Sequence, residues 1–234
     1  GADAKDSTAS LAAVPNYLAG MKRGLRGLRV GIDSRWNEEG VDAATLKVMV
    51  GALAAVRELG ADVREVTFPD PAQVIVDWFP LCGIEAAVVH ESTYPARKEM
   101  YGPALAGLLD LGHAQTGMDY QKIVLNRLAF TGKVRAMFEG IDLLLMPSQG
   151  VASPTLQRML TFGTDAEMMS AMLRYTCPLD TSGSPTITLP GGFTDAGTPV
   201  AFQFVSRHFE EELLVRAGWA FQQATDWHQR HPAL

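Results

Sequence analysis

Cysteine and long apolar runs are scarce in this sequence. Its 234 residues include two cysteines, Cys82 and Cys177, which are far apart and form no Cys-x-x-Cys pair. They therefore predict neither a disulfide framework nor a thiolate metal site, and they fit a reducing, cytoplasmic location. No uninterrupted run of roughly 18 or more apolar residues occurs, so we expect no membrane span. Residues 1–10 lack the basic and apolar regions of a signal peptide, and we expect none here.

Positive charge is also in short supply. The formal net charge is −6 and no basic run occurs, which makes nucleic acid an improbable partner. Two sequence motifs are absent as well. Without G-x-G-x-x-G there is no dinucleotide fingerprint, and without G-x-S-x-G there is no α/β-hydrolase nucleophile turn. The composition, with 47% hydrophobic and 20% charged residues, is typical of a folded globular chain.

The clearest local pattern is a strand, a helix and a strand over residues 28–68. Residues 28–33 form a short apolar run, and apolar residues then recur at three- and four-residue spacing up to Leu59. Asp42 is suited to cap the start of this helix, and Gly60 is suited to the position just past its end. Residues 62–68 alternate as a strand does, so a right-handed βαβ unit with parallel strands is predicted.

The rest of the chain predicts further helices and strands. Helices are expected over 71–91, with an interruption near Pro80, over 165–175 behind an Asp165 cap, and over 210–228. Another is expected over 119–139, with its inward side formed by Ile123, Val124, Leu128, Val134, Met137 and Phe138. Strands are expected over 141–146, 186–189 and 200–205, the last two joined by turn residues. The predicted fold class is α/β, with a mixed sheet flanked by helices.

Few residues outside this framework suggest catalysis. The candidate nucleophiles Ser148, Ser182 and Ser184 lie in small-residue loops, where an ordinary loop hydrogen bond is the favoured interpretation. His90 could act as a base, although a half-buried histidine at a helix end is favoured. The pair His228 and His231 lacks a third ligand, so no metal site is expected.

Residues 175–207 carry the most specific pattern. They are expected to form a loop, a strand, a turn and a second strand, in which a small, polar loop over 180–185 could approach a ligand or simply connect. The segment resembles the C-terminal signature of amidase signature hydrolases, and the matching positions are Pro178, Gly183, Pro185, Pro190, Gly192, Phe193, Gly197, Pro199, Val200 and Gln203. Asp180 stands where that pattern usually has Asn.

Three other segments agree with this resemblance. Residues 1–10, with Asp3, Asp6 and Thr8, resemble the Asp-rich loop after the family's catalytic segment, residues 28–68 its later βαβ unit, and residues 141–148 its buried strand and loop. The resemblance covers the whole chain but only about the second half of the family's fold. It implies one domain over 1–234, in which 1–27 is a loop or linker and 175–234 hold a pocket loop, a hairpin and the C-terminal helix.

The resemblance also implies a function. Amidase signature enzymes hydrolyse carboxamides with a Ser–cis-Ser–Lys triad and need neither metal nor organic cofactor. The lysine and the Gly/Ser-rich segment belong to the family's first half, so no catalytic residue is assigned here and the chain alone is expected to be inactive. The positions that match the family's pocket loops are Ser148, Gln149, Asp180, Thr181 and Ser182.

Asp180 has two open interpretations. Its carboxylate could bind a polar substrate group, or it could cap a backbone turn. The expected partners are a small-molecule amide in the full-length enzyme, and either the missing N-terminal catalytic half or a second copy of the chain, because a half-sheet would leave an unpaired edge and an apolar face. The alternative is a non-catalytic binding or structural subunit that has an amidase-like half-fold.

Overall fold

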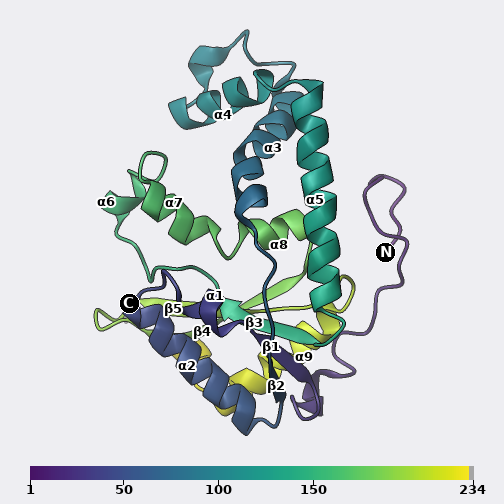
Figure 1. The fold of residues 1–234 in the computed structure, drawn as a ribbon, viewed down its shortest axis with the longest axis vertical. Helices are drawn as coiled ribbons and strands as arrows, with labels where there is room; N and C mark the ends of the chain where they lie inside the picture. Colours follow the sequence, from purple (N-terminus) through teal and green to yellow (C-terminus); the bar gives the residue numbers. More distant parts are fainter. Residues whose placement is uncertain (232–234) are drawn as a thin grey trace. The chain divides into compact units, whose positions relative to one another are not determined.

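A computed structural model describes residues 1–231. Its contacts divide the chain into two compact units. Unit 1 consists of Gly1–Thr67, Met137–Ser153 and Ser184–Leu234, and unit 2 consists of Phe68–Ala136 and Pro154–Gly183. The ribbon in Figure 1 follows the chain through both units. Each unit is described by itself below.

Unit 1 is built around a five-stranded sheet of order β2-β1-β3-β5-β4. The first three strands in this order are parallel, and β5 pairs antiparallel with both β3 and β4. The strands are β1 (Arg29–Ile32), β2 (Asp62–Glu65), β3 (Leu143–Pro147), β4 (Thr186–Phe193) and β5 (Pro199–Val205). The predicted mixed α/β fold and the parallel strands of the predicted βαβ unit are therefore confirmed.

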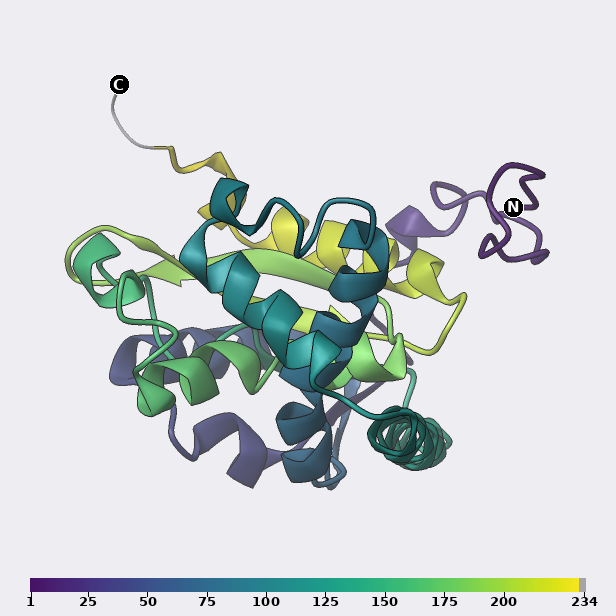
Figure 2. The ribbon, with the colours of Figure 1, turned by 90° about the horizontal axis from the view of Figure 1, so that it is seen from above.

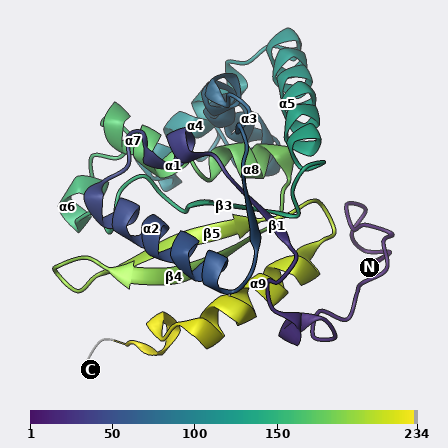
Figure 3. The ribbon, with the colours of Figure 1, turned by 60° about the horizontal axis from the view of Figure 1, so that its bottom comes forward.

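Two helices, α2 (Ala43–Glu58) and α9 (Glu211–Ala224), lie on one side of this sheet, as Figures 1 and 3 show. Their inward residues join alternate residues of β1, β3 and β5 in one core. The predicted cap of α2 is present, because the Asp42 side chain accepts from Thr45 N, and Gly60 follows the helix with φ +83°. The shorter elements of unit 1 are α1 (Ser34–Glu38) and the 3₁₀ turns η1 (Met21–Arg23) and η3 (Trp227–Gln229).

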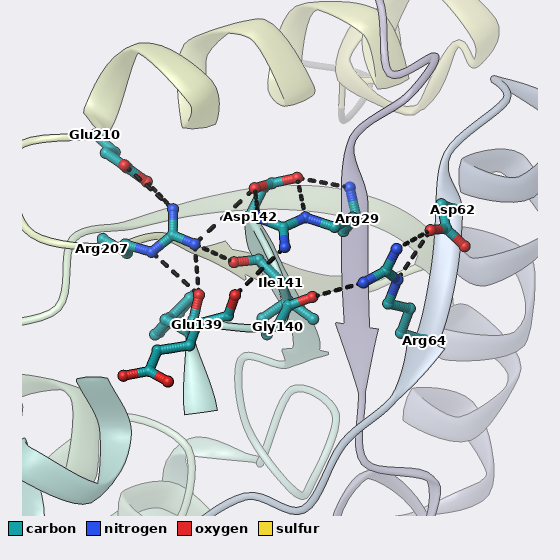
Figure 4. Close-up of polar contacts among 10 residues, drawn as sticks. Arg29, Asp62, Arg64, Glu139, Gly140, Ile141, Asp142, Arg207 and Glu210 are labelled. Atoms are coloured by element: carbon teal, nitrogen blue, oxygen red, sulfur yellow. Dashed lines mark hydrogen bonds and ion pairs between the residues drawn. The ribbon is translucent and has the colours of Figure 1, made fainter. Parts of the chain in front are cut away.

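Three arginines hold the segment that leads into β3 (Figure 4). The Arg29 guanidinium donates to both carboxylate oxygens of Asp142, at 2.5 and 3.1 Å, and Arg64 donates to Gly140 O at 3.1 Å. Arg207 donates to the carbonyls of Phe138 and Ile141. The bond from Arg29 is the largest cause that lowers the pKa of the Asp142 carboxyl. This network fixes where β3 starts, and every residue of β3 is buried.

Unit 2 is helical. Its long helices are α3 (Ala72–His90), α4 (Pro103–His113) and α5 (Gly117–Met137), and α5 is seen nearly end-on in Figure 2. The backbones of α3 and α4 approach very closely, because a Cβ atom built on Gly112 would lie 2.0 Å from Gly83 O. The shorter helices are η2 (Lys98–Met100), α6 (Leu156–Met159), α7 (Ala166–Leu173) and α8 (Cys177–Ser182).

Several expectations need correction. Helix α3 continues through Pro80 instead of breaking there. The expected loop over 180–185 begins inside the short helix α8, and β4 extends four residues further than expected, with a bulge between Pro190 and Gly192. Leu128 was expected to face inward, but its side chain is 63% exposed.

One helix among residues 1–231, α3, is long and apolar enough to cross a membrane by length and composition. Over an 18-residue stretch of this helix the mean hydropathy is 1.5, and 22% of that stretch is buried inside the protein. Such a segment was not expected from the sequence because Asp77 and Glu85 interrupt the apolar run. A core helix can meet the same criterion, so the absence of a membrane span stays a prediction.

Candidate functional site

The predicted site residues Ser148 and Gln149 follow directly after β3 in unit 1. The Ser148 hydroxyl donates to Ala201 O at 3.0 Å, and the buried Gln203 amide donates to Pro147 O at 3.0 Å. Both bonds tie the end of β3 to the neighbouring β5. A hydroxyl that donates to a carbonyl is not activated by a base, so this arrangement matches the loop-hydrogen-bond interpretation of Ser148.

A small cavity of about 140 Å³ lies beside this loop, and its lining comprises Thr45, Ser148, Gln149, Val151, Ala152, Ser153, Pro199, Val200 and Ala201. Ser153, with φ +40°, donates to Pro199 O at 2.9 Å. The cavity therefore lies between the start of α2, the loop after β3 and the start of β5. It is polar enough at the serines and at Gln149 to accept hydrogen-bonding groups.

Asp42 organises the wall of this cavity. Its carboxylate accepts from Thr45 N at 2.8 Å and from Ala152 N at 2.7 Å, while its own N–H donates to Gly150 O at 2.9 Å. Burial acts to raise the pKa of the Asp42 carboxyl, but the N–H donors outweigh it and the pKa lies below its ordinary value. The sequence identified Asp42 as a helix cap only. Its second role joins residues 110 positions apart, and no local pattern could have indicated it.

The other predicted site residues, Asp180, Thr181 and Ser182, lie on α8 in unit 2. Pro178 stands in the first turn of this helix, and Gly183 ends it in the left-handed conformation with φ +69°. Thr181 and Ser182 are 4% and 3% exposed, whereas Asp180 is exposed. The helix thus presents only one of the three predicted side chains outward.

The two inward residues contribute to the packing of unit 2. Ser182 Oγ donates to Leu179 O at 3.1 Å, and Arg127 Nε donates to Thr181 O at 2.9 Å. The Cys177 thiol lies one turn before Thr181, and burial raises the pKa of this thiol to about 12. Cys177 is therefore a neutral core residue and not a reactive thiolate.

Asp180 is the most distinctive residue of α8. Partial desolvation raises the pKa of its carboxyl above the ordinary value. Among residues 1–231 its carboxylate makes no hydrogen bond or ion pair. The interpretation of Asp180 as a cap of a backbone turn therefore gains no support from the described residues, and the carboxylate is available to a polar ligand.

The structure also places the three histidines that were considered from the sequence. His90 ends α3, is half-buried, and lies with Nδ1 3.1 Å from the Tyr101 hydroxyl. His228 belongs to η3 and is half-buried, and His231 is exposed. Within the described part of the chain, no group of three or more His, Cys, Asp or Glu residues could hold a metal ion.

Sequence comparison finds relatives that are longer than this chain. The protein AmiD of Mycobacterium tuberculosis is 39% identical over 100% of this chain and 49% of its own length. An amidase of Pseudomonas putida is 33% identical over 94% of this chain and 48% of its length, and one subunit of the glutamyl-tRNA(Gln) amidotransferase of Geotalea daltonii is 29% identical over 100% and 53%. The chain spans about half the length of the curated relatives it matches.

Solved structures give the same coverage. 6-Aminohexanoate cyclic dimer hydrolase in complex with substrate matches with a TM-score of 0.85 and 25% identity, over 99% of this chain and 52% of that one. A bacterial aryl acylamidase of the amidase signature family shares the fold, with a TM-score of 0.77 and 19% identity, over 94% and 48%. The family model described as Amidase matches residues 1–215. The chain therefore belongs to the amidase family.

Proposed function

We propose that this chain is the C-terminal portion of an amide-bond hydrolase, which converts a carboxamide to a carboxylate and an amine or ammonia. The observation that carries the proposal is the family match over residues 1–215, together with relatives of about twice the length. The proposed enzyme is cytoplasmic, and it uses neither a metal nor an organic cofactor. Its substrate is a small-molecule amide.

The chemistry in this proposal belongs to a Ser–cis-Ser–Lys triad that lies outside this chain. A serine must be activated by a base before it attacks an amide carbonyl, and the resulting oxyanion must be met by preorganised donors. This sequence has no Gly-Gly-Ser-Ser run that could supply such a segment. The proposed contribution of the chain is therefore substrate recognition, and the chain alone is inactive.

Recognition is assigned to the loop after β3 in unit 1 and, separately, to Asp180 on α8 in unit 2. The Ser148–Gln149 loop borders a cavity of about 140 Å³, and its position is fixed by hydrogen bonds to β5 and to Asp42. Asp180 is an exposed carboxylate that has no ion-pair partner among the described residues. A carboxylate of this kind suits a charge-assisted hydrogen bond to an amine or a hydroxyl of the substrate.

The test is turnover of a panel of small amides by the purified 234-residue chain. We expect no hydrolysis above the buffer rate, because the nucleophile and its base are missing. Hydrolysis that persists after serine-to-alanine changes elsewhere, but is lost in Ser148→Ala, Ser182→Ala or Ser184→Ala, would place the nucleophile in this chain and refute the proposal. Far-UV circular dichroism of each variant verifies that it is folded.

A non-catalytic subunit is the second candidate, because one of the relatives belongs to a multi-subunit amidotransferase. The two candidates differ in the reading frame upstream of Gly1. A lysine followed by a Gly/Ser-rich segment in the same frame supports the hydrolase. A start codon at that point supports a separate, non-catalytic polypeptide.

A further inference from the structure

Unit 1 has a second cavity, of about 250 Å³, that is separate from the Ser148–Gln149 loop. It opens where the parallel strands β1 and β3 end at their carboxyl ends, between α1 and α2, which Figure 3 shows in succession after β1. The chain leaves β1 toward β2 on one side, whereas β3 pairs with β1 on the other. Crevices at such a change of direction are preferred ligand sites in α/β sheets.

The wall of this cavity is mainly apolar, and it is formed by Ile32, Leu46, Met49, Val50, Leu53 and Leu145. Val50 is 70% exposed, so the cavity is open to solvent along α2. An apolar cavity of this size can hold a phenyl ring or a short alkyl chain. The apolar wall accounts for affinity but does not by itself specify a ligand.

Specificity comes from Asn37, which lines the cavity and is 7% exposed. Its Nδ2 donates to Leu145 O at 3.0 Å. A carbonyl oxygen only accepts, so this bond fixes the amide orientation and turns Oδ1 the other way. Asn37 Oδ1 is buried and has no hydrogen-bond partner among residues 1–231. A buried acceptor without a partner is costly. Solvent does not reach Oδ1, so a ligand donor that satisfies it must first displace the side chains that cover it.

The remaining polar groups of the cavity are also acceptors or are already occupied. Glu38 is an exposed carboxylate on the lining, and no Lys, Arg or His residue lines the cavity. Ser34 uses its N–H and its hydroxyl to donate to the Glu65 carboxylate, at 2.7 and 2.9 Å. The cavity therefore combines an apolar wall, one buried acceptor and one negative charge.

We infer that this cavity binds a small primary amine with an apolar body, whose ammonium group donates to Asn37 Oδ1 and faces Glu38. The inference goes beyond the proposed hydrolase, because no residue of this cavity belongs to the substrate loops of that proposal. An ammonium group matches both acceptors. The apolar body would cover the lining residues that solvent now reaches.

The test is titration of the 234-residue chain with 2-phenylethylamine at pH 7, followed by calorimetry or NMR. We expect a Kd of about 1 mM or tighter, which suits a ligand of this size. Two matched ligands separate the contributions. 2-Phenylethanol keeps a donor but has no charge, and the trimethylammonium analogue keeps the charge but has no donor. Both should bind several-fold more weakly than the amine.

Protein variants locate the site. Asn37→Leu should weaken amine binding about tenfold and leave the trimethylammonium analogue nearly unaffected. Leu53→Trp should fill the cavity and abolish binding, whereas Leu125→Trp, at a 55% exposed position of α5, should not. Circular dichroism verifies folding, and Leu53→Trp replaces Asn37→Leu as the decisive variant if the latter unfolds. Absence of binding at about 10 mM amine, undiminished binding to Leu53→Trp, or equal binding of the amine and its trimethylammonium analogue would overturn the inference.

Discussion

At the residue scale, Asp42 connects a helix start to the candidate substrate loop. Replacement by alanine removes an N-cap and leaves the N–H groups of Thr45 and Ala152 without their acceptor. We expect Asp42→Ala to lower the free energy of unfolding by about 2 kcal/mol. Asp42→Asn is the matched control, because asparagine is also a good cap, and it should cost less than about 1 kcal/mol. Urea unfolding measures both, and equal losses would contradict the assigned role of the cap.

The same carboxyl gives a pH prediction. Its pKa in the folded chain is below the ordinary value, so the unfolded chain binds the proton more tightly. The stabilisation from Asp42 is therefore fully present above the unfolded pKa of about 4, and it is lost as pH falls through the lower folded pKa. The stability difference between the wild type and Asp42→Asn should shrink as urea unfolding is repeated from pH 6 to pH 3. A difference that is constant over this range would contradict the assignment.

At the element scale, the sequence predicted the segments whose patterns are local. Asp42 and Gly60 indicated the ends of α2, and the nearly continuous apolar run over 141–146 indicated the buried β3. Helix α8 was missed because its six residues have the composition of a loop. Pro178 is compatible with helix in the first turn, so a residue that usually indicates a break here lies in the first turn of the helix.

Other errors have tertiary causes. Pro80 was expected to interrupt α3, but helix α3 continues past it and packs against α4. Leu128 follows the inward periodicity of α5 yet is 63% exposed, because periodicity gives a stripe and not the width of the covered surface. The candidate site has the same limit. The sequence indicated the loop after β3, whereas the bond from Asp42 to Ala152 N and the inward position of Thr181 on α8 depend on packing.

The approach of α3 and α4 yields a sharp prediction. A Cβ atom on Gly112 would meet backbone atoms of Gly83 at 2.0 and 2.2 Å, and backbone cannot move aside as a flexible side chain can. Gly112→Ala should therefore force the helices apart and destabilise the protein by about 3 kcal/mol. Gly107→Ala is the matched control, since Gly107 lies in the same helix with nothing within 4 Å of its Cβ position. Helix propensity predicts a gain of about 0.5–1 kcal/mol there. Thermal unfolding measures both variants, and equal shifts in their midpoint temperatures would show that the two backbones do not meet.

At the scale of the whole molecule, the five-stranded sheet of unit 1 has two edges. The edges are β2 and β4, since β2 pairs only with β1 and β4 only with β5 among the described residues. The edge strand β2 carries the charged residues Asp62, Arg64 and Glu65, and charges on an edge discourage pairing with another chain. The strand β4 has no charged residue. Only β4 therefore presents a backbone edge that another strand could extend.

This edge predicts self-association of the isolated chain. Residues Thr186–Leu189 are β-branched or apolar, and Thr188 is exposed, so a second copy could add a strand along β4. We expect light scattering after size exclusion to give a mass above that of a 25.3 kDa monomer at about 100 µM chain. Thr188→Lys should return the mass toward the monomer, because lysine at an edge opposes pairing, whereas Gln121→Lys adds the same charge to exposed α5 and should not. A monodisperse wild-type monomer would contradict the prediction, and equal effects of the two lysines would attribute the association to net charge instead of to the β4 edge.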